Sequence, residues 1–216
     1  TLTDAVIDET LIGGPVGEIA GFTRFRRVDI EAGVVVGPNG SPSFPYLEIY
    51  EDLDLDGTIE LQGSGTRSYL NLFEFDEVRG DGAIILSGVK EDQNFQARNE
   101  VRLFGQVGGV EEIFTIGAGI EITGRGSVFT WSGEDRMRIL GDLTADGGTL
   151  TVTRIDQGGG VLTVGEQNGG QLVLNQVSDA VIEAQAGSEV VLQGLLRGIE
   201  INGPGEVELQ SSDVDG

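Results

Sequence analysis

The chain has 216 residues, of which 38% are apolar, and its 36 acidic and 13 basic side chains give a net charge of −23. This length fits one folded unit with a packed interior. The negative charge excludes nucleic acid as an expected partner, and no run approaches the roughly 20 apolar residues of a membrane-spanning helix, so no membrane insertion is expected. Thr1–Thr10 lack the basic and apolar regions of a signal peptide, so any such peptide is expected to be already removed.

Cysteine and histidine are both absent, and Lys90 is the only lysine. A Ser-His-Asp triad, a Cys-His dyad and a conventional zinc site are therefore excluded. Any catalysis would depend on carboxylates, Arg, Tyr or a bound metal, and we do not expect an enzyme.

The first twelve residues form a candidate strand without a glycine corner, and residues 13–216 form the predicted repeat domain. This strand either folds back as a cap or adds to the edge of another subunit. The apolar residues expected to mediate self-association there are Leu2, Val6, Ile7, Leu11 and Ile12.

Arg24, Arg26 and Arg27 form a basic patch in an otherwise acidic chain. They are expected to pair with Asp29 and Glu31 in their own strand region. The alternative is that they receive an acidic surface of another copy.

Beyond this patch, short segments with two apolar residues at alternate positions recur along the chain, each bounded by glycine or polar corners. Residues two apart on a strand share a face, so each apolar pair is predicted to point inward and the residues between them outward. The pairs are Leu47 and Ile49, Ile59 and Leu61, Ile84 and Leu86, Val101 and Leu103, Ile120 and Ile122, Met137 and Ile139, Leu150 and Val152, Leu162 and Val164, Leu172 and Leu174, Val190 and Leu192, Ile199 and Ile201, and Val207 and Leu209.

Asp52, Asp54 and Asp56 alternate with Leu53 and Leu55 and precede a glycine. Outward carboxylates in a row repel one another unless a cation is present, so calcium is a candidate cofactor here. A solvated strand face is the competing interpretation, since the position of the bidentate Glu of an EF-hand holds Gly63. Further on, Arg79-Gly80-Asp81 matches an integrin-binding tripeptide, which we attribute to coincidence in a chain rich in Gly and Asp.

Two outward patterns point to possible ligands. Trp131 and Phe129, with Tyr46, Tyr50 and Tyr69, suggest a surface for glycans, although most aromatic residues are expected in the core. Thr149, Thr151, Thr153 and Thr163 resemble the threonine ladder of an ice-binding solenoid. We reject that interpretation because the positions expected to align with the first three are Gln171, Val173 and Asn175.

Short strands at this spacing allow a sandwich, an antiparallel barrel or a parallel solenoid. The self-similar glycine-led units favour an all-β parallel β-solenoid with short strands and Gly-rich corners. Gly147–Val152 and Gly159–Val164 resemble repeats of autotransporter passenger domains and filamentous-haemagglutinin-like adhesins over about the last hundred residues. This resemblance implies a right-handed β-helix with a secreted or cell-surface role.

Val207 and Leu209 continue the repeat almost to residue 216, so we expect the coil ends to join copies of the chain head to tail. The expected function is a secreted structural protein that forms extracellular fibres, or an adhesive module with cell-surface or matrix glycans as candidate partners. The alternative is a polysaccharide lyase or glycoside hydrolase that uses carboxylates on a β-helix scaffold. The short corners leave little room for the groove of such an enzyme.

Overall fold

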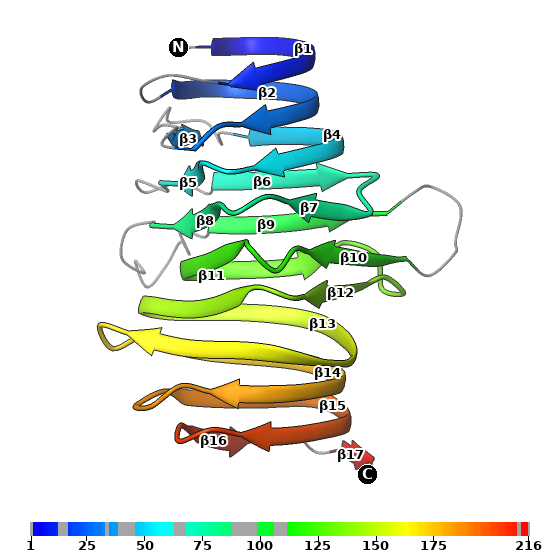
Figure 1. The fold of residues 1–216 in the computed structure, drawn as a ribbon, viewed down its shortest axis with the longest axis vertical. Helices are drawn as coiled ribbons and strands as arrows, with labels where there is room; N and C mark the ends of the chain where they lie inside the picture. The colour runs from blue at the N-terminus through cyan, green and yellow to red at the C-terminus, as the bar shows by residue number, and fades with distance from the viewer. Residues whose placement is uncertain are drawn as a thin grey trace, which may run out of the picture.

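The computed structural model describes residues 2–12, 17–32, 35–38, 46–62, 68–87, 99–105, 112–210 and 213–215, and the side chains of most of these from residue 24 onward. This described part is all-β and contains no helix (Figure 1). The strands are β1 (Leu2–Ile12), β2 (Gly17–Ile30), β3 (Val35–Pro38), β4 (Tyr46–Leu55), β5 (Thr58–Leu61), β6 (Ser68–Phe73), β7 (Glu77–Arg79), β8 (Ala83–Leu86), β9 (Asn99–Phe104), β10 (Ile113–Ile116), β11 (Glu121–Thr130), β12 (Arg136–Ile139), β13 (Asp142–Gln167), β14 (Gln171–Ala184), β15 (Glu189–Asn202), β16 (Glu206–Leu209) and β17 (Asp213–Asp215).

These strands pair in parallel and wind into stacked coils, which confirms the predicted β-solenoid (Figure 1). The coils share three faces. The first face runs through β2, β4, β6, β9, β11, β13, β14, β15 and β16. The second face runs through β2, β4, β7, β10, β12, β13, β14, β15 and β17. The third face runs through β2, β3, β5, β8, β11 and the start of β13. It continues through the end of β13, which belongs to the next coil, and then through β14 and β15.

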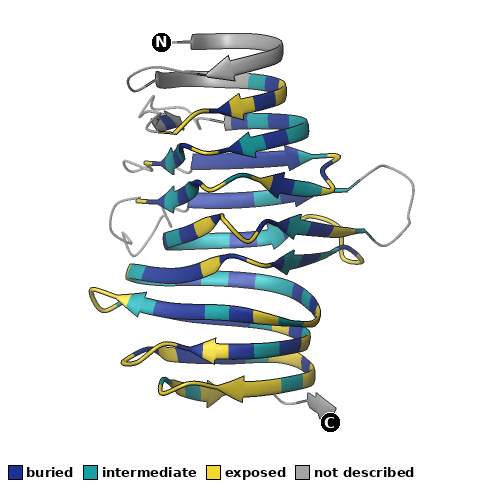
Figure 2. Ribbon diagram, in the orientation of Figure 1, coloured by how far each residue is buried: buried dark blue, intermediate teal, exposed yellow. Residues whose placement is uncertain are grey.

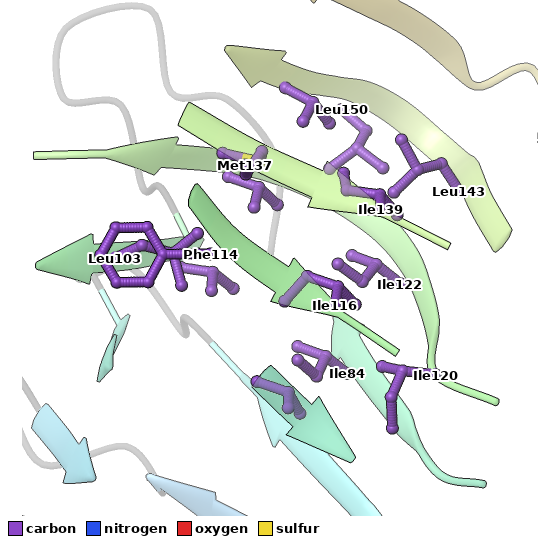
Figure 3. Packing of buried hydrophobic residues seen from close by; sticks show 14 of the residues in the cluster. Ile84, Leu103, Phe114, Ile116, Ile120, Ile122, Met137, Ile139, Leu143 and Leu150 are labelled. Carbon is purple, nitrogen blue, oxygen red and sulfur yellow. The ribbon is translucent and has the colours of Figure 1, made fainter. Parts of the chain in front are cut away.

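The core is a set of columns in which each inward side chain packs on its counterpart in the next coil (Figure 3). Ile84, for example, lies in register with Ile59 on one side and Ile122 on the other. All three are fully buried. A parallel ladder repeats at ~4.8 Å, so the columns leave no room for water between coils.

The inward assignment is confirmed for every predicted pair from Leu47 to Leu192, and Asp54 and Thr151 point outward between buried neighbours. It is wrong about burial at the last two pairs. Ile201 is 42% exposed and Leu209 is 56% exposed, while Ile199 and Val207 are half-buried. Leu209 still aligns with the buried Leu192, but the final coil has a described neighbour on one side only (Figure 2).

The register also confirms the alignment that argued against a threonine ladder. Thr149 pairs with Gln171, Thr151 with Val173 and Thr153 with Asn175. A flat array of hydroxyl groups therefore ends after one coil on this face.

The corner between the first and second faces departs from the predicted glycine-rich chemistry. Five non-glycine residues there adopt positive φ angles, namely Arg27, Glu51, Glu74, Arg154 and Gln176. A left-handed conformation costs an ordinary residue about 1 to 2 kcal/mol. The stacked ladders on both sides of the corner hold each of these residues in place, so this corner is defined by the fold and not by its residue types.

One buried polar side chain replaces a missing strand contact. β12 meets β13 only at Met137 and Ile155, and Gln157 lies beside this short pairing at 2% exposure. Its Nε2 donates to the Ile139 carbonyl oxygen at 2.5 Å, and its Oε1 accepts from the Ile139 amide at 3.0 Å. The Gln157 amide thus satisfies both backbone groups that a neighbouring strand would otherwise pair.

The inward columns make one stability prediction. Leu172→Asp places an unpaired carboxylate in a fully buried column and should destabilise the fold by about 3 kcal/mol or more. Gln171→Asp, at the adjacent exposed position, is the matched control and should have an effect within about 0.5 kcal/mol. Chemical denaturation followed by circular dichroism measures both. Equal stabilities of the two variants would contradict the inward direction of Leu172.

Candidate functional site

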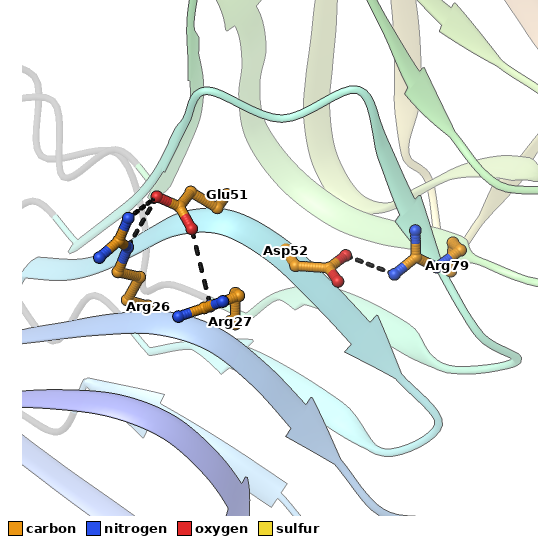
Figure 4. A network of polar contacts seen from close by, with 5 residues as sticks. All are labelled: Arg26, Arg27, Glu51, Asp52 and Arg79. Atoms are coloured by element: carbon orange, nitrogen blue, oxygen red, sulfur yellow. Dashed lines mark hydrogen bonds and ion pairs between the residues drawn. The ribbon is translucent and has the colours of Figure 1, made fainter.

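The basic patch lies on the outer side of β2 and pairs across the ladder with the next coil, as Figure 4 shows for Arg26 and Arg27. Arg24 Nη2 lies 2.9 Å from Glu48 Oε2, Arg26 contacts Glu51 Oε1, and Arg27 Nε lies 3.6 Å from Glu51 Oε2. These partners lie in β4, because the register places β4 beside β2. The sequence had predicted Asp29 and Glu31 as the partners instead. The arginines are 41% to 50% exposed, so each pair contributes at most about 1 kcal/mol.

The acidic row predicted to bind calcium lies on the outside of β4 and just beyond it. Asp52 Oδ1 accepts from Arg79 Nη2 at 2.5 Å (Figure 4). Asp56 Oδ1 accepts from the Asp81 amide at 3.1 Å. Asp54 lies opposite Asp29 in the preceding coil and Arg79 in the following one. The row is therefore partly neutralised by Arg79.

Partial burial, followed by the charges of Asp29 and Asp56, raises the pKa of Asp54, and Arg79 acts in the opposite direction. A carboxyl whose pKa is raised by like charges is one that a cation would stabilise in its ionised form. Across the described ranges, no group of three or more acidic side chains is arranged closely enough to hold a metal. Calcium binding by Asp52, Asp54 and Asp56 therefore stays a prediction.

The Arg79-Gly80-Asp81 tripeptide has a structural explanation in the same region. Gly80 has a φ of +105°, and a Cβ there would lie 2.4 Å from the Leu55 carbonyl oxygen, so only glycine fits. With Arg79 paired to Asp52 and the Asp81 amide donating to Asp56, the tripeptide forms a corner of the solenoid.

An aromatic column runs along the outer side of the first face. The ring centroids of Tyr50 and Phe73 are 4.5 Å apart, those of Phe73 and Phe104 are 4.4 Å apart, and those of Phe104 and Trp131 are 5.3 Å apart. These distances are close to the coil spacing, because each ring occupies the same register position in its coil.

This column changes the interpretation of the aromatic residues as a glycan surface. The rings stack on one another, so within the column most ring faces are covered by protein and cannot receive a sugar. Trp131 ends the stack and is 58% exposed. The prediction from sequence included Tyr50 and Trp131 but missed Phe73 and Phe104. The signal was present, since each column residue immediately follows the second inward position of its strand.

A partly buried ion pair lies beside this column. Arg102 Nη2 and Nε donate to Glu100 Oε2 at 2.5 and 2.8 Å, and the Arg102 guanidinium lies 3.7 Å from the centroid of the Tyr69 ring. The side chains of Arg102 and Glu100 are only 15% and 9% exposed. Tyr69 is buried beneath this pair, so it too does not offer a free ring for stacking on a sugar.

A surface hollow of about 460 Å³ bears on the enzymatic alternative. Its lining consists of Gly158, Gly159, Asp179, Ala180, Val181, Gly198 and Glu200. Both of its carboxylates are exposed to water, whereas the general acid of a glycosidase typically lies in an apolar environment. The hollow gives no specific support for catalysis, and the enzymatic alternative stays a prediction.

In comparisons with known proteins, no family model, no curated protein and no solved structure matches this chain. Nothing in the part of the chain described is a helix long and apolar enough to cross a membrane.

The Arg102 and Glu100 pair predicts strong coupling. Arg102→Ala leaves the nearly buried Glu100 without its partner and should destabilise the fold by about 3 kcal/mol. Glu100→Gln alone should have a smaller effect, and adding it to Arg102→Ala should recover part of the loss. A double-mutant cycle of unfolding free energies measures this. Additive effects would show that the two charges act independently.

The raised pKa of Asp54 predicts a pH-dependent effect. Ionised Asp54 opposes folding, so the contribution of Asp54 to the stability of the wild-type protein should become less favourable as pH rises through its ordinary pKa of 3.8 and its raised folded pKa. In chelator at neutral pH, Asp54→Asn should therefore melt at a higher temperature than wild type, and the difference should vanish at low pH. Added calcium should stabilise wild type more than Asp54→Asn. Identical calorimetric titrations of calcium into the two proteins would contradict cation binding at this row.

Proposed function

We propose that this chain is a structural β-solenoid whose coil end associates with a second copy to build extended assemblies. The observation that supports this is the exposure of the final coil. Leu209 and Ile201 continue inward columns that are fully buried at Leu192 and Ile182 one coil earlier. At the final coil the same columns face solvent (Figure 2).

The energetic argument concerns both side chains and backbone. Apolar area removed from water contributes about 25 cal/mol per Å², so covering these column ends is favourable. The outer edge of a parallel strand such as β16 also presents backbone donors and acceptors in the spacing that another coil requires. A second copy that supplies a coil satisfies both requirements at once.

The complementary surface in this proposal is β1. Its backbone pairs with β2 in parallel from Leu2, opposite Ile19, to Ile12, opposite Ile30. β1 is thus a coil of the same geometry at the opposite end of the stack (Figure 1). The side chains of Leu2, Val6, Ile7, Leu11 and Ile12 lie outside the described residues, and their role in self-association stays part of the proposal.

The high negative charge is consistent with such a role. Assembly along the axis buries apolar columns, while the acidic lateral surfaces repel one another unless salt or calcium screens them. Head-to-tail contacts that do not close into a ring produce a filament. A location outside the cell, and weak multivalent contacts with surface glycans, complete the proposal and rest on the resemblance of the repeats to adhesins.

The experiment changes the exposed column end. Leu209→Asp should shift the concentration needed for assembly upward by about tenfold or more, as measured by sedimentation at high salt and by negative-stain microscopy. Val161→Asp is the matched control, because Val161 is 45% exposed on the side of the stack and should leave assembly unchanged. Deleting residues 1–12 should also abolish long assemblies.

The outcomes separate the parts of this proposal. A wild-type protein that stays monomeric at high concentration with salt and calcium would contradict end-to-end association. Normal filaments from the truncated protein would contradict the role of β1 alone. Equal effects of Leu209→Asp and Val161→Asp would show that the final coil is not the interface.

A further inference from the structure

Two carboxylates meet at the corner between the first and second faces, away from the acidic row on β4. Glu112 directly precedes β10 and Asp135 directly precedes β12, and the first residues of these strands, Ile113 and Arg136, are paired. Glu112 and Asp135 are therefore neighbours on successive coils. The Glu112 amide donates to Asp135 Oδ1 at 3.3 Å, which ties the two corners together.

The second carboxylate oxygen of Asp135 has no hydrogen-bond partner, although Asp135 is only 3% exposed. The rest of the residue is held firmly: its carbonyl oxygen accepts from Thr130 Oγ1 at 3.0 Å and from Arg136 Nη1 at 3.2 Å. A buried ionised carboxylate without a compensating partner is costly, so Oδ2 has unused capacity for a ligand.

Gly105 shows where this oxygen points. A Cβ placed on Gly105 would lie 2.8 Å from Asp135 Oδ2 and also 2.8 Å from Glu112 Oε2. Both carboxylate oxygens therefore border the same small space above the Gly105 backbone. That space exists because residue 105 has no side chain.

We propose that Asp135 Oδ2 and Glu112 Oε2 bind a divalent, oxygen-ligated cation of the calcium class in the space above Gly105. Two carboxylates supply the charge that such an ion prefers, and waters complete its shell of six to eight oxygens. The ion compensates the buried, unpartnered Oδ2 of Asp135, and Glu112 on the adjacent coil supplies the second carboxylate ligand. It thereby clamps β10 to β12 at this corner.

The site is independent of Asp52, Asp54 and Asp56 and of the end-to-end association proposed above. The test uses the full chain with Asp52, Asp54 and Asp56 all changed to Asn as background, so that only the new site is read. Calcium is titrated at high monovalent salt, which suppresses loose binding to the acidic surface, by calorimetry and by thermal unfolding.

The background protein should bind calcium at one site and melt several degrees higher when saturated. Adding Asp135→Asn should abolish that rise and, in chelator, should raise the melting temperature because the uncompensated charge is gone. Adding Glu112→Gln should weaken calcium binding about tenfold or more. Asp142→Asn removes an exposed carboxylate elsewhere and is the charge-matched control, with calcium binding unchanged.

Gly105→Ala provides a test that keeps both carboxylates. Its methyl group fills the space between them, so calcium binding should be lost while the circular dichroism spectrum stays that of the wild-type protein. If the background protein shows no calcium binding and no calcium-dependent rise in melting temperature, the cation site is wrong. Retention of full calcium affinity in both Asp135→Asn and Gly105→Ala would place the ion elsewhere and would equally overturn the proposal.

Discussion

The parallel backbone ladder is the interaction on which the rest of this structure depends. Each coil hydrogen-bonds to the next in register on three faces, so a residue's main neighbour is its counterpart one coil away. Residues at the same register position therefore form columns, and residues of the same chemical kind contact one another from coil to coil. Apolar columns make the core, and aromatic residues at one register position make the stack from Tyr50 to Trp131.

The same rule makes charge the main structural problem of this chain. Acidic residues that would be far apart in a globular fold are placed about one coil spacing apart when they share a register position. Where an arginine of the neighbouring coil is available, as for Glu48, Glu51 and Asp52, opposite charges meet across the ladder and the pair forms. At two places, Asp29 with Asp54 and Glu112 with Asp135, the ladder instead brings carboxylates of successive coils close together.

The ladder also explains why the sides of the stack differ from the surface of its final coil. The sides of the stack satisfy their backbone groups within the chain, and their side chains pair across coils. The final coil instead presents apolar columns to solvent, with Leu209 the most exposed of them. Growth along the axis repeats an interaction that the protein already uses throughout its length, which is the physical basis for proposing an assembly role.

The sequence by itself determined the class of fold and the direction of the core residues. Alternation of apolar residues predicted the inward pairs correctly from Leu47 to Leu192, because burial on one face of a strand leaves a period of two in the chain. It could not determine which distant residues share a column, since coil lengths vary and several corners contain an extra residue, as at Glu51 and Asp52. Only the tertiary structure decided that Arg24 meets Glu48, that Phe73 and Phe104 connect Tyr50 to Trp131, and that Glu112 meets Asp135 over Gly105. Likewise, Leu209 has the same local pattern as Leu192, and its exposure arises from its position at the last described coil, a property of the stack that no local pattern encodes.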